Sequence, residues 1–312
     1  MRILLWHVHG SWTDAFVRGG HEYFVPASPE GAPWGLGRAG RQWPAVTEVP
    51  LDRLADAQPD VVVLQRVEEA AFVGAQLGTR VPQIYLEHNA PRHGAAVSRH
   101  PMAGQDAIPI VHVTSYNALM WDNGIAPVTV VPHGIPDPGE RYTGELPAGA
   151  AMINEPRRRE RVTGADLLPA FREIAPVRLF GMGTAGLPGG QGDVPPPRLY
   201  DELARHRVYL HTARWTSLGL SLLEAMLLGM PVVAVASTAA PGAVPPEAGV
   251  VSADIEVLAR RFRELVHEPD FAVLAGKAAR EHALAHFGLD AFLARWDRLL
   301  TETAPAVEGA AR

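Results

Sequence analysis

The sequence contains no cysteine. A chain without cysteine has no disulfide bond, no catalytic thiolate and no zinc or iron–sulfur site with sulfur ligands. Positive charge is not in excess either, because 28 basic residues stand against 34 acidic ones and the formal net charge is -6. We therefore expect no broad electrostatic surface for nucleic acid.

Lysine and long hydrophobic runs are also scarce. Lys277 is the single lysine, so arginine is expected at sites where similar proteins use lysine. The apolar runs are shorter than the roughly 18 residues of a membrane span, and the amino-terminal segment does not resemble a secretory signal. The histidines lack the spacing of a metal site, and the sequence has neither GxSxG nor a P-loop. These features predict a soluble, cytoplasmic protein without a metal cofactor.

Short β-branched runs alternate with stretches of helical periodicity along the chain. Predicted strands cover Arg2–Val8, Asp60–Leu64, Gln83–Leu86, Pro109–Val113, Val128–Val131, Pro176–Phe180, Val208–His211 and Pro231–Ala236. Predicted helices cover Val67–Leu77, Tyr116–Trp121, Gly164–Ile174, Ser221–Leu228, Leu258–Glu268, Phe271–Phe287 and Ala291–Leu300. This alternation indicates an α/β fold with parallel sheets.

Two segments rich in proline and glycine interrupt this alternation of strands and helices. Ile135–Gly149 predicts a linker between a first domain, 1–140, and a second, 150–287. Gly181–Pro197 has no periodicity and predicts a long surface loop. The last segment, 288–303, carries an apolar stripe at helical spacing that contains Trp296.

The most informative segment is Thr216–Val233, which reads TSLGLSLLEAMLLGMPVV. A small polar loop with a glycine precedes a helix that carries Glu224, and Gly229 and Pro231 then end the helix and begin a strand. Free N–H groups at such a helix start suit a diphosphate, and a carboxylate on the helix can accept hydrogen bonds from ribose hydroxyls. The alternative interpretation is a buried helix–turn–strand with no ligand.

This segment resembles the donor-site motif of glycosyltransferase family 4, whose members have the GT-B fold. The family pattern is Glu-Gly-Phe-Gly-Leu, three residues, Glu-Ala-Met, a few residues, and Gly-x-Pro-Val-Val. Matches fall at Gly219, Leu220, Glu224, Ala225, Met226, Gly229, Pro231, Val232 and Val233. The resemblance implies that Glu224 binds the ribose and that Ser217, Leu218 and Gly219 line the donor. The first Glu of the pattern, which lies near the donor sugar, is replaced by Thr216.

A second match begins at Arg161 and ends at Phe171, and resembles the family segment Lys-Gly-x-Asp-x-Leu-x-x-Ala-Phe. The family uses that lysine and an upstream arginine to grip the donor diphosphate, but Thr163 stands at the lysine position. We expect one or two of Arg157, Arg158 and Arg161 to replace it, since arginine binds phosphate bidentately. The alternative is a solvated charged turn.

Weaker matches lie in the first domain. His88 follows a predicted strand at the place where the family has a histidine that contacts the donor sugar, and Gly19 and Gly20 match a glycine pair near the phosphates. His133 replaces an asparagine in a turn between the domains. Aromatic residues near the first strand, among them Trp6 and Trp12, either line an acceptor pocket or belong to the core.

The resemblance implies two Rossmann-like domains that face each other across a cleft, with the final helix returning to the first domain. It implies transfer of a sugar from a nucleotide-diphosphate-sugar donor to a hydroxyl acceptor, with retention and without a metal, and peripheral membrane contact if the acceptor is a lipid. The catalytic residues would be His88 and Thr216. A non-catalytic sugar-nucleotide binder, a sugar-nucleotide epimerase and an interaction protein are the alternatives.

Overall fold

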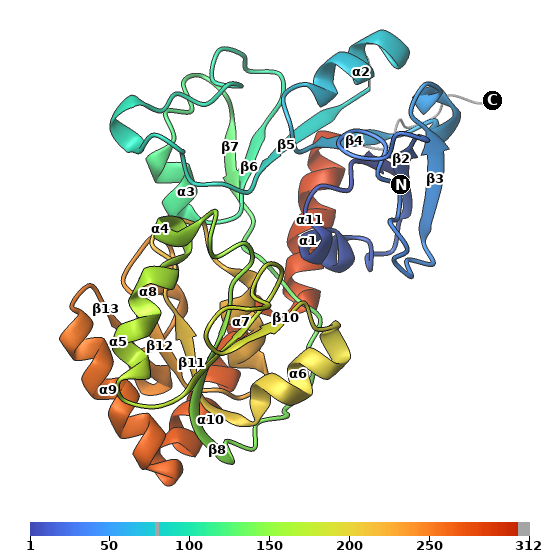
Figure 1. Ribbon diagram of the computed structural model, residues 1–312. Helices are drawn as coiled ribbons and strands as arrows, with labels where there is room; N and C mark the ends of the chain where they lie inside the picture. The colour runs from blue at the N-terminus through green and yellow to red at the C-terminus, as the bar shows by residue number, and fades with distance from the viewer. Residues whose placement is uncertain (79–80, 305–312) are drawn as a thin grey trace. The chain divides into compact units, whose positions relative to one another are not determined.

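The computed structural model describes residues 1–78 and 81–304, and the chain forms two compact units. Unit 1 comprises Met1–Gly134 together with the final segment from Leu289, and unit 2 comprises Ile135–Gly288. Each unit is built on one parallel sheet (Figure 1). In the described part of the chain, no helix is long and apolar enough to cross a membrane.

The sheet of unit 1 has seven parallel strands in the order β3-β2-β1-β4-β5-β6-β7. The strands are β1 (Arg2–Leu5), β2 (Glu22–Ala27), β3 (Val46–Pro50), β4 (Val61–Leu64), β5 (Gln83–Glu87), β6 (Ile110–His112) and β7 (Val128–Val130). The central strand β4 reads VVVL and is buried along its whole length, as expected for a strand covered on both faces. The helices of unit 1 are α1 (Gly10–Phe16), α2 (Glu69–Gln76), α3 (Ser115–Met120) and α11 (Leu289–Thr303), with 3₁₀ turns at Leu54–Ala57 and Ala95–Val97.

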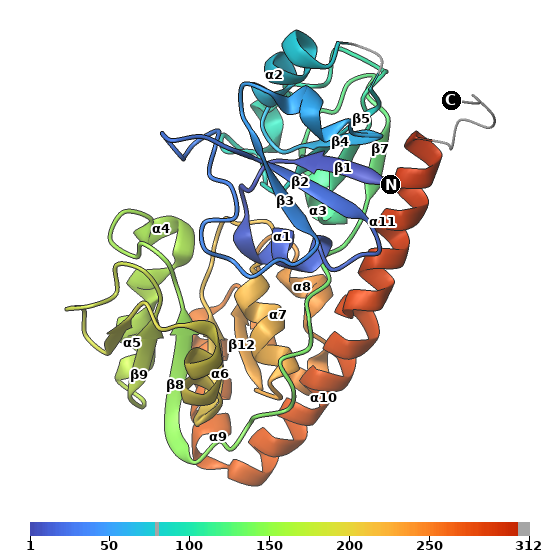
Figure 2. The ribbon, with the colours of Figure 1, turned by 90° about the vertical axis from the view of Figure 1, so that its right-hand side faces the viewer.

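The last helix, α11, packs on unit 1 (Figure 2). The ring of Trp296 lies 5.6 Å from Trp12 and 5.0 Å from Phe16, centroid to centroid, and both partners belong to α1. On the exposed side, His21 Nε2 lies 2.9 Å from Asp297. The chain therefore returns to unit 1 after Gly288, as the family resemblance implied.

The sheet of unit 2 has six parallel strands in the order β10-β9-β8-β11-β12-β13. They are β8 (Leu146–Met152), β9 (Val177–Phe180), β10 (Gly190–Gly192), β11 (His206–His211), β12 (Val232–Val235) and β13 (Gly249–Ser252). The helices are α4 (Glu160–Thr163), α5 (Leu168–Arg172), α6 (Pro196–Ala204), α7 (Leu220–Leu227), α8 (Ala240–Ala243), α9 (Ile255–His267) and α10 (Pro269–Phe287), with 3₁₀ turns at Ala165–Leu167 and Pro246–Ala248. Two parallel sheets in two units confirm the predicted α/β class.

The predicted linker, Ile135–Gly149, is wrong in its last four residues, because β8 begins at Leu146. This strand reads LPAGAAM, and its small residues leave room for α9: a Cβ at Gly149 would lie 2.8 Å from the ring of Phe262. The predicted loop Gly181–Pro197 likewise contains β10 and the start of α6.

Candidate functional site

The connection from β11 to α7 in unit 2 is a polar loop whose backbone is held by hydrogen bonds. Its Ser217 carbonyl accepts a hydrogen bond from Thr238 Oγ1 at 2.7 Å, and Leu218 is buried in the core of the unit. Thr216 is half-buried, and Gly219 is the N-cap residue of α7. In the first turn of α7 the Leu222 N–H donates to the Gly219 carbonyl at 3.0 Å. The N–H groups that precede it, at the very start of the helix, lie outside the i to i−4 ladder and are suited to an anion.

A glycine is required at position 219 because the ring of His211 lies against it. A Cβ there would come within 2.8 Å of His211 Cε1, closer than side chains tolerate. His211 ends β11 and is buried, and burial lowers its pKa to about 4. The imidazole is therefore neutral at physiological pH, and its ring packs against the loop at Gly219.

Glu224 lies on α7, slightly more than one turn beyond Gly219, and is half-buried. Burial raises the pKa of its carboxyl to about 7, and a hydrogen bond with Tyr200 opposes that rise. A carboxyl group kept in an environment that disfavours its charge is typical of a functional position. The structure thus brings Ser217, Gly219 and Glu224 onto one strand–loop–helix connection.

The segment around α4 is joined to this loop. Thr212 Oγ1 donates to the Thr163 carbonyl at 2.8 Å, and the backbone N–H of Arg214 donates to the Val162 carbonyl at 2.9 Å. The hydroxyl of Thr163 donates to the Arg159 carbonyl at 3.1 Å inside the short helix. Thr163 therefore holds the helix and its neighbour loop together, and its side chain is buried.

The arginines next to α4 are engaged with carboxylates. Arg161 Nη1 lies 2.8 Å from Asp166, and Arg214 binds the same carboxylate through both of its Nη atoms, with Nη2 at 2.9 Å. The pKa of Asp166 is lowered, chiefly by its hydrogen bonds with Arg214. Burial opposes this shift, and the contact with Arg161 adds to it. Arg158 Nε lies 3.6 Å from Glu155. Sequence reasoning missed Arg214, although it stands two residues before Thr216.

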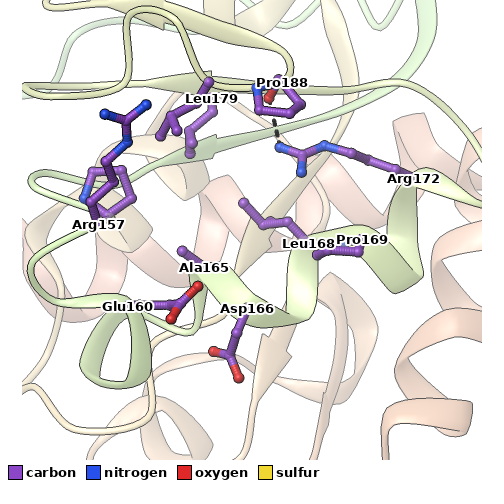
Figure 3. A pocket seen from close by; sticks show the side chains of 11 residues that line it. Arg157, Glu160, Ala165, Asp166, Leu168, Pro169, Arg172, Leu179 and Pro188 are labelled. Atoms are coloured by element: carbon purple, nitrogen blue, oxygen red, sulfur yellow. Dashed lines mark hydrogen bonds between the residues drawn. The ribbon is translucent and has the colours of Figure 1, made fainter.

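Arg157 lines a small pocket between α4, α5 and β9, which Asp166 also borders (Figure 3). The volume of this pocket is about 200 Å³, below the roughly 300–1,000 Å³ of small-molecule sites. Arg172 crosses it and donates to the Pro188 carbonyl at 2.8 Å. Glu224 is not among its lining residues, so the structure does not bring Arg157 and Glu224 into one pocket.

In unit 1, His88 follows β5 and is buried among other rings. Its centroid lies 4.0 Å from His9, 5.4 Å from Trp12 and 6.4 Å from His133. Burial, followed by the nearby His9 and His133, holds the pKa of His88 well below its usual range. The imidazole is therefore neutral.

The tautomer of His88 follows from its partner, Gln65. The amide nitrogen of Gln65 donates to the Trp6 carbonyl at 2.6 Å, which leaves its oxygen facing His88 Nε2 at 2.9 Å. Since that oxygen can only accept, Nε2 carries the proton and Nδ1 carries the lone pair. His88 thus presents a hydrogen-bond acceptor at Nδ1.

The other residues predicted in unit 1 lie apart from His88 or in the core. Gly19 and Gly20 follow α1 and precede β2, at the amino ends of the strands, where the Glu22 N–H donates to the Met1 carbonyl. His88 lies at the opposite, carboxyl end of the sheet. Trp6 and Trp12 are 1% and 2% exposed, so both belong to the core.

Comparison with known proteins bears on this arrangement. Residues 191–282 match the family model described as "Glycosyl transferases group 1". No curated protein sequence matches the chain. The matched segment contains α7 and Glu224.

Solved structures resemble the whole chain at low identity. Anabaena Alr3699/HepE in complex with UDP is 14% identical with a TM-score of 0.73, covering 97% of this chain and 100% of its own. Sucrose-phosphate synthase from Thermosynechococcus elongatus is 16% identical with a TM-score of 0.69, covering 96% and 98%. A glycosyltransferase from Rickettsia africae is 12% identical with a TM-score of 0.69, covering 97% and 98%. Residues 191–282 therefore match a glycosyltransferase group 1 domain, and the chain as a whole has the GT-B fold of these solved glycosyltransferases.

Proposed function

We propose that the protein transfers a sugar from a nucleoside-diphosphate sugar to a hydroxyl acceptor, as a cytoplasmic, family 4 type enzyme. The observation that carries the proposal is the half-buried Glu224 on α7, behind a polar loop that ends at the amino-terminal turn of that helix. Solved structures of Anabaena HepE with UDP and with UDP-glucose support a donor of this class. We infer the same class of donor for this chain.

Glu224 would accept hydrogen bonds from the two ribose hydroxyls. The diphosphate would lie at the start of α7, where N–H groups and the helix dipole favour negative charge. Of the three predicted arginines, Arg161 is best placed to assist, because it borders the segment that contacts the loop and is 75% exposed. Asp166 contacts both Arg161 and Arg214. A phosphate can therefore replace Asp166 on Arg161, because Asp166 keeps its ion pair with Arg214.

His88 would act on the transferred sugar. A neutral imidazole with its lone pair on Nδ1 accepts a hydrogen bond from a sugar hydroxyl and fixes the ring for reaction. Departure of the nucleoside diphosphate needs stabilised negative charge, which helix N–H groups and arginine supply without a metal. Retention follows if an oxygen of the leaving diphosphate deprotonates the acceptor on the same face of the sugar.

Thr216 favours a second candidate function, a sugar-nucleotide binder without transferase activity. The family pattern has glutamate there, and a threonine hydroxyl hydrogen-bonds but carries no charge. Turnover separates the two candidates, because a binder shows affinity for the donor and releases no nucleoside diphosphate.

A thermal-shift screen of the full chain with UDP-, GDP- and ADP-sugars tests the proposal. We expect one nucleotide to raise the melting temperature of the wild type and to have little effect on Glu224→Ala. Glu281→Ala is the control, because Glu281 is exposed on α10. An equal shift in wild type and Glu224→Ala would remove Glu224 from the site.

A further inference from the structure

A pocket of about 600 Å³ lies at the carboxyl ends of β4 and β5 in unit 1. The residues after β4, Gln65–Glu68, form one wall, and residues after β5 form another. Its volume falls within the roughly 300–1,000 Å³ of small-molecule sites. The carboxyl ends of parallel strands are also where α/β sheets bind their ligands.

Three guanidinium groups line this pocket. Arg66 is held in place, because its Nε donates to Glu69 at 2.9 Å and its guanidinium carbon lies 4.4 Å from the ring centre of Trp34. Within residues 1–78 and 81–304, Arg92 has neither a hydrogen-bond nor an ion-pair partner, and Arg99 Nε lies 4.0 Å from the exposed Asp122. Guanidinium groups with free N–H donors bind phosphate or carboxylate bidentately.

The same pocket contains groups suited to a sugar ring. Trp34 and Trp121 are half-buried in its lining. Arg66 covers one face of Trp34, which leaves its other face and the ring of Trp121 as aromatic surface for a sugar. Trp121 is fixed by a hydrogen bond from Nε1 to the Asn89 carbonyl at 2.9 Å. Glu68 adds a carboxylate that can accept hydrogen bonds from hydroxyl groups, whereas the carboxylate of Glu87 is buried and already engaged by Asn89 and His100.

We propose that this pocket binds the acceptor of the transfer reaction, and that the acceptor is an anionic sugar. Its phosphate or carboxylate lies on Arg92 and Arg99, and its ring lies against the tryptophans. A neutral sugar would leave Arg92 without a partner and Arg99 with only the long contact to Asp122, and a bare anion would not use the aromatic faces. The inference rests on the proposed function, since it assigns the acceptor of that reaction.

Calorimetric titration of the full chain tests the inference with four ligands: glucose 6-phosphate, glucuronate, glucose and inorganic phosphate. We expect at least one of the two anionic sugars to bind about tenfold or more tightly than glucose and than inorganic phosphate. Which of the two binds identifies the anionic group. Affinity should also fall with added salt, because the contact is an exposed charge pair.

Substitutions locate the binding. Arg92→Ala and Arg99→Ala should each weaken the anionic sugar about fivefold to tenfold. Arg53→Ala is the matched control, because Arg53 is 64% exposed and ion-paired, as Arg99 is, but lies outside the pocket. We expect Arg53→Ala to bind as the wild type does.

Three results would overturn the inference: no binding of either anionic sugar, equal binding of glucose or of inorganic phosphate, or equal weakening by Arg53→Ala. A parallel titration with the nucleoside diphosphate found in the thermal-shift screen separates this inference from the proposed function. If the nucleotide binds and the anionic sugars do not, the acceptor assignment fails and the donor site stands.

Discussion

Replacing Glu224 by glutamine should stabilise the protein at alkaline pH and weaken its binding of nucleotide. Burial raises the pKa of Glu224 from its ordinary value of about 4.5 to about 7. The folded protein therefore holds a proton that the unfolded chain releases, and wild-type stability falls as the pH rises from about 4.5 to about 7. Each pKa unit is about 1.4 kcal/mol, so the unfavourable contribution above pH 7 is about 3 kcal/mol.

Glutamine has the same shape, carries no charge and still accepts a hydrogen bond from Tyr200. Glu224→Gln should thus be more stable than the wild type by up to about 3 kcal/mol at pH 8 and nearly equal to it at pH 4.5. Urea unfolding at both pH values, followed by circular dichroism, measures the difference. Glu281→Gln, at an exposed position on α10, should show no such pH-dependent gain.

The same substitution should cost about 1.5–3 kcal/mol of nucleotide binding, because a hydrogen bond to a charged group is lost. Stability and affinity then change in opposite directions, as expected where a protein keeps an unfavourable charge for function. A gain in stability of equal size at both pH values would show a packing effect and refute the electrostatic reasoning. A loss of stability at pH 8 would refute it as well.

Other substitutions test single contacts. Trp296→Ala should lower the free energy of unfolding by about 3–5 kcal/mol, since the side chain is 1% exposed and packs on α1; a loss below about 1 kcal/mol in urea denaturation would contradict its place in the core. Gly219→Ala should lower stability by about 1–3 kcal/mol and weaken nucleotide binding, because a Cβ would lie 2.8 Å from the buried His211. Gly20→Ala, where a Cβ meets nothing within 4 Å, is its control, and calorimetry showing equal effects for both would refute the packing argument. His88→Ala should lower kcat much more than it raises the Kd for nucleotide, and steady-state kinetics with a parallel increase in both would remove it from catalysis.

The elements of the segment Thr216–Val233 could be predicted from sequence because they are neighbours in the chain. The segment runs from the loop with Gly219 through the helix with Glu224 to the helix end at Gly229. These residues are so close in sequence that their spacing alone predicts how they lie relative to one another. The central strands were predicted for the same reason, since VVVL in β4 is a local signal.

Contacts between distant residues had no such signal. Arg214 and Asp166 are 48 positions apart and pair only after β11 and α4 come together. The tautomer of His88 depends on Gln65, 23 positions away, and through it on the Trp6 carbonyl. The strand β8 was missed because its alanines and glycine have weak strand propensity, and its place is set by the packing of Phe262 on Gly149.

The central claim is that α7 and its preceding loop bind a nucleoside-diphosphate sugar that the enzyme then cleaves. Phosphorus NMR of the full chain, incubated in turn with UDP-glucose, GDP-mannose and ADP-glucose, follows hydrolysis of each donor, in which water takes the place of the acceptor and nucleoside diphosphate and free sugar are released. We predict release from one of the three donors by the wild type and by Glu281→Ala, and at least tenfold slower release by Glu224→Ala at subsaturating donor. Binding of a donor without release by the wild type would show a binder, and release at equal rates by the wild type and Glu224→Ala would contradict the site described here.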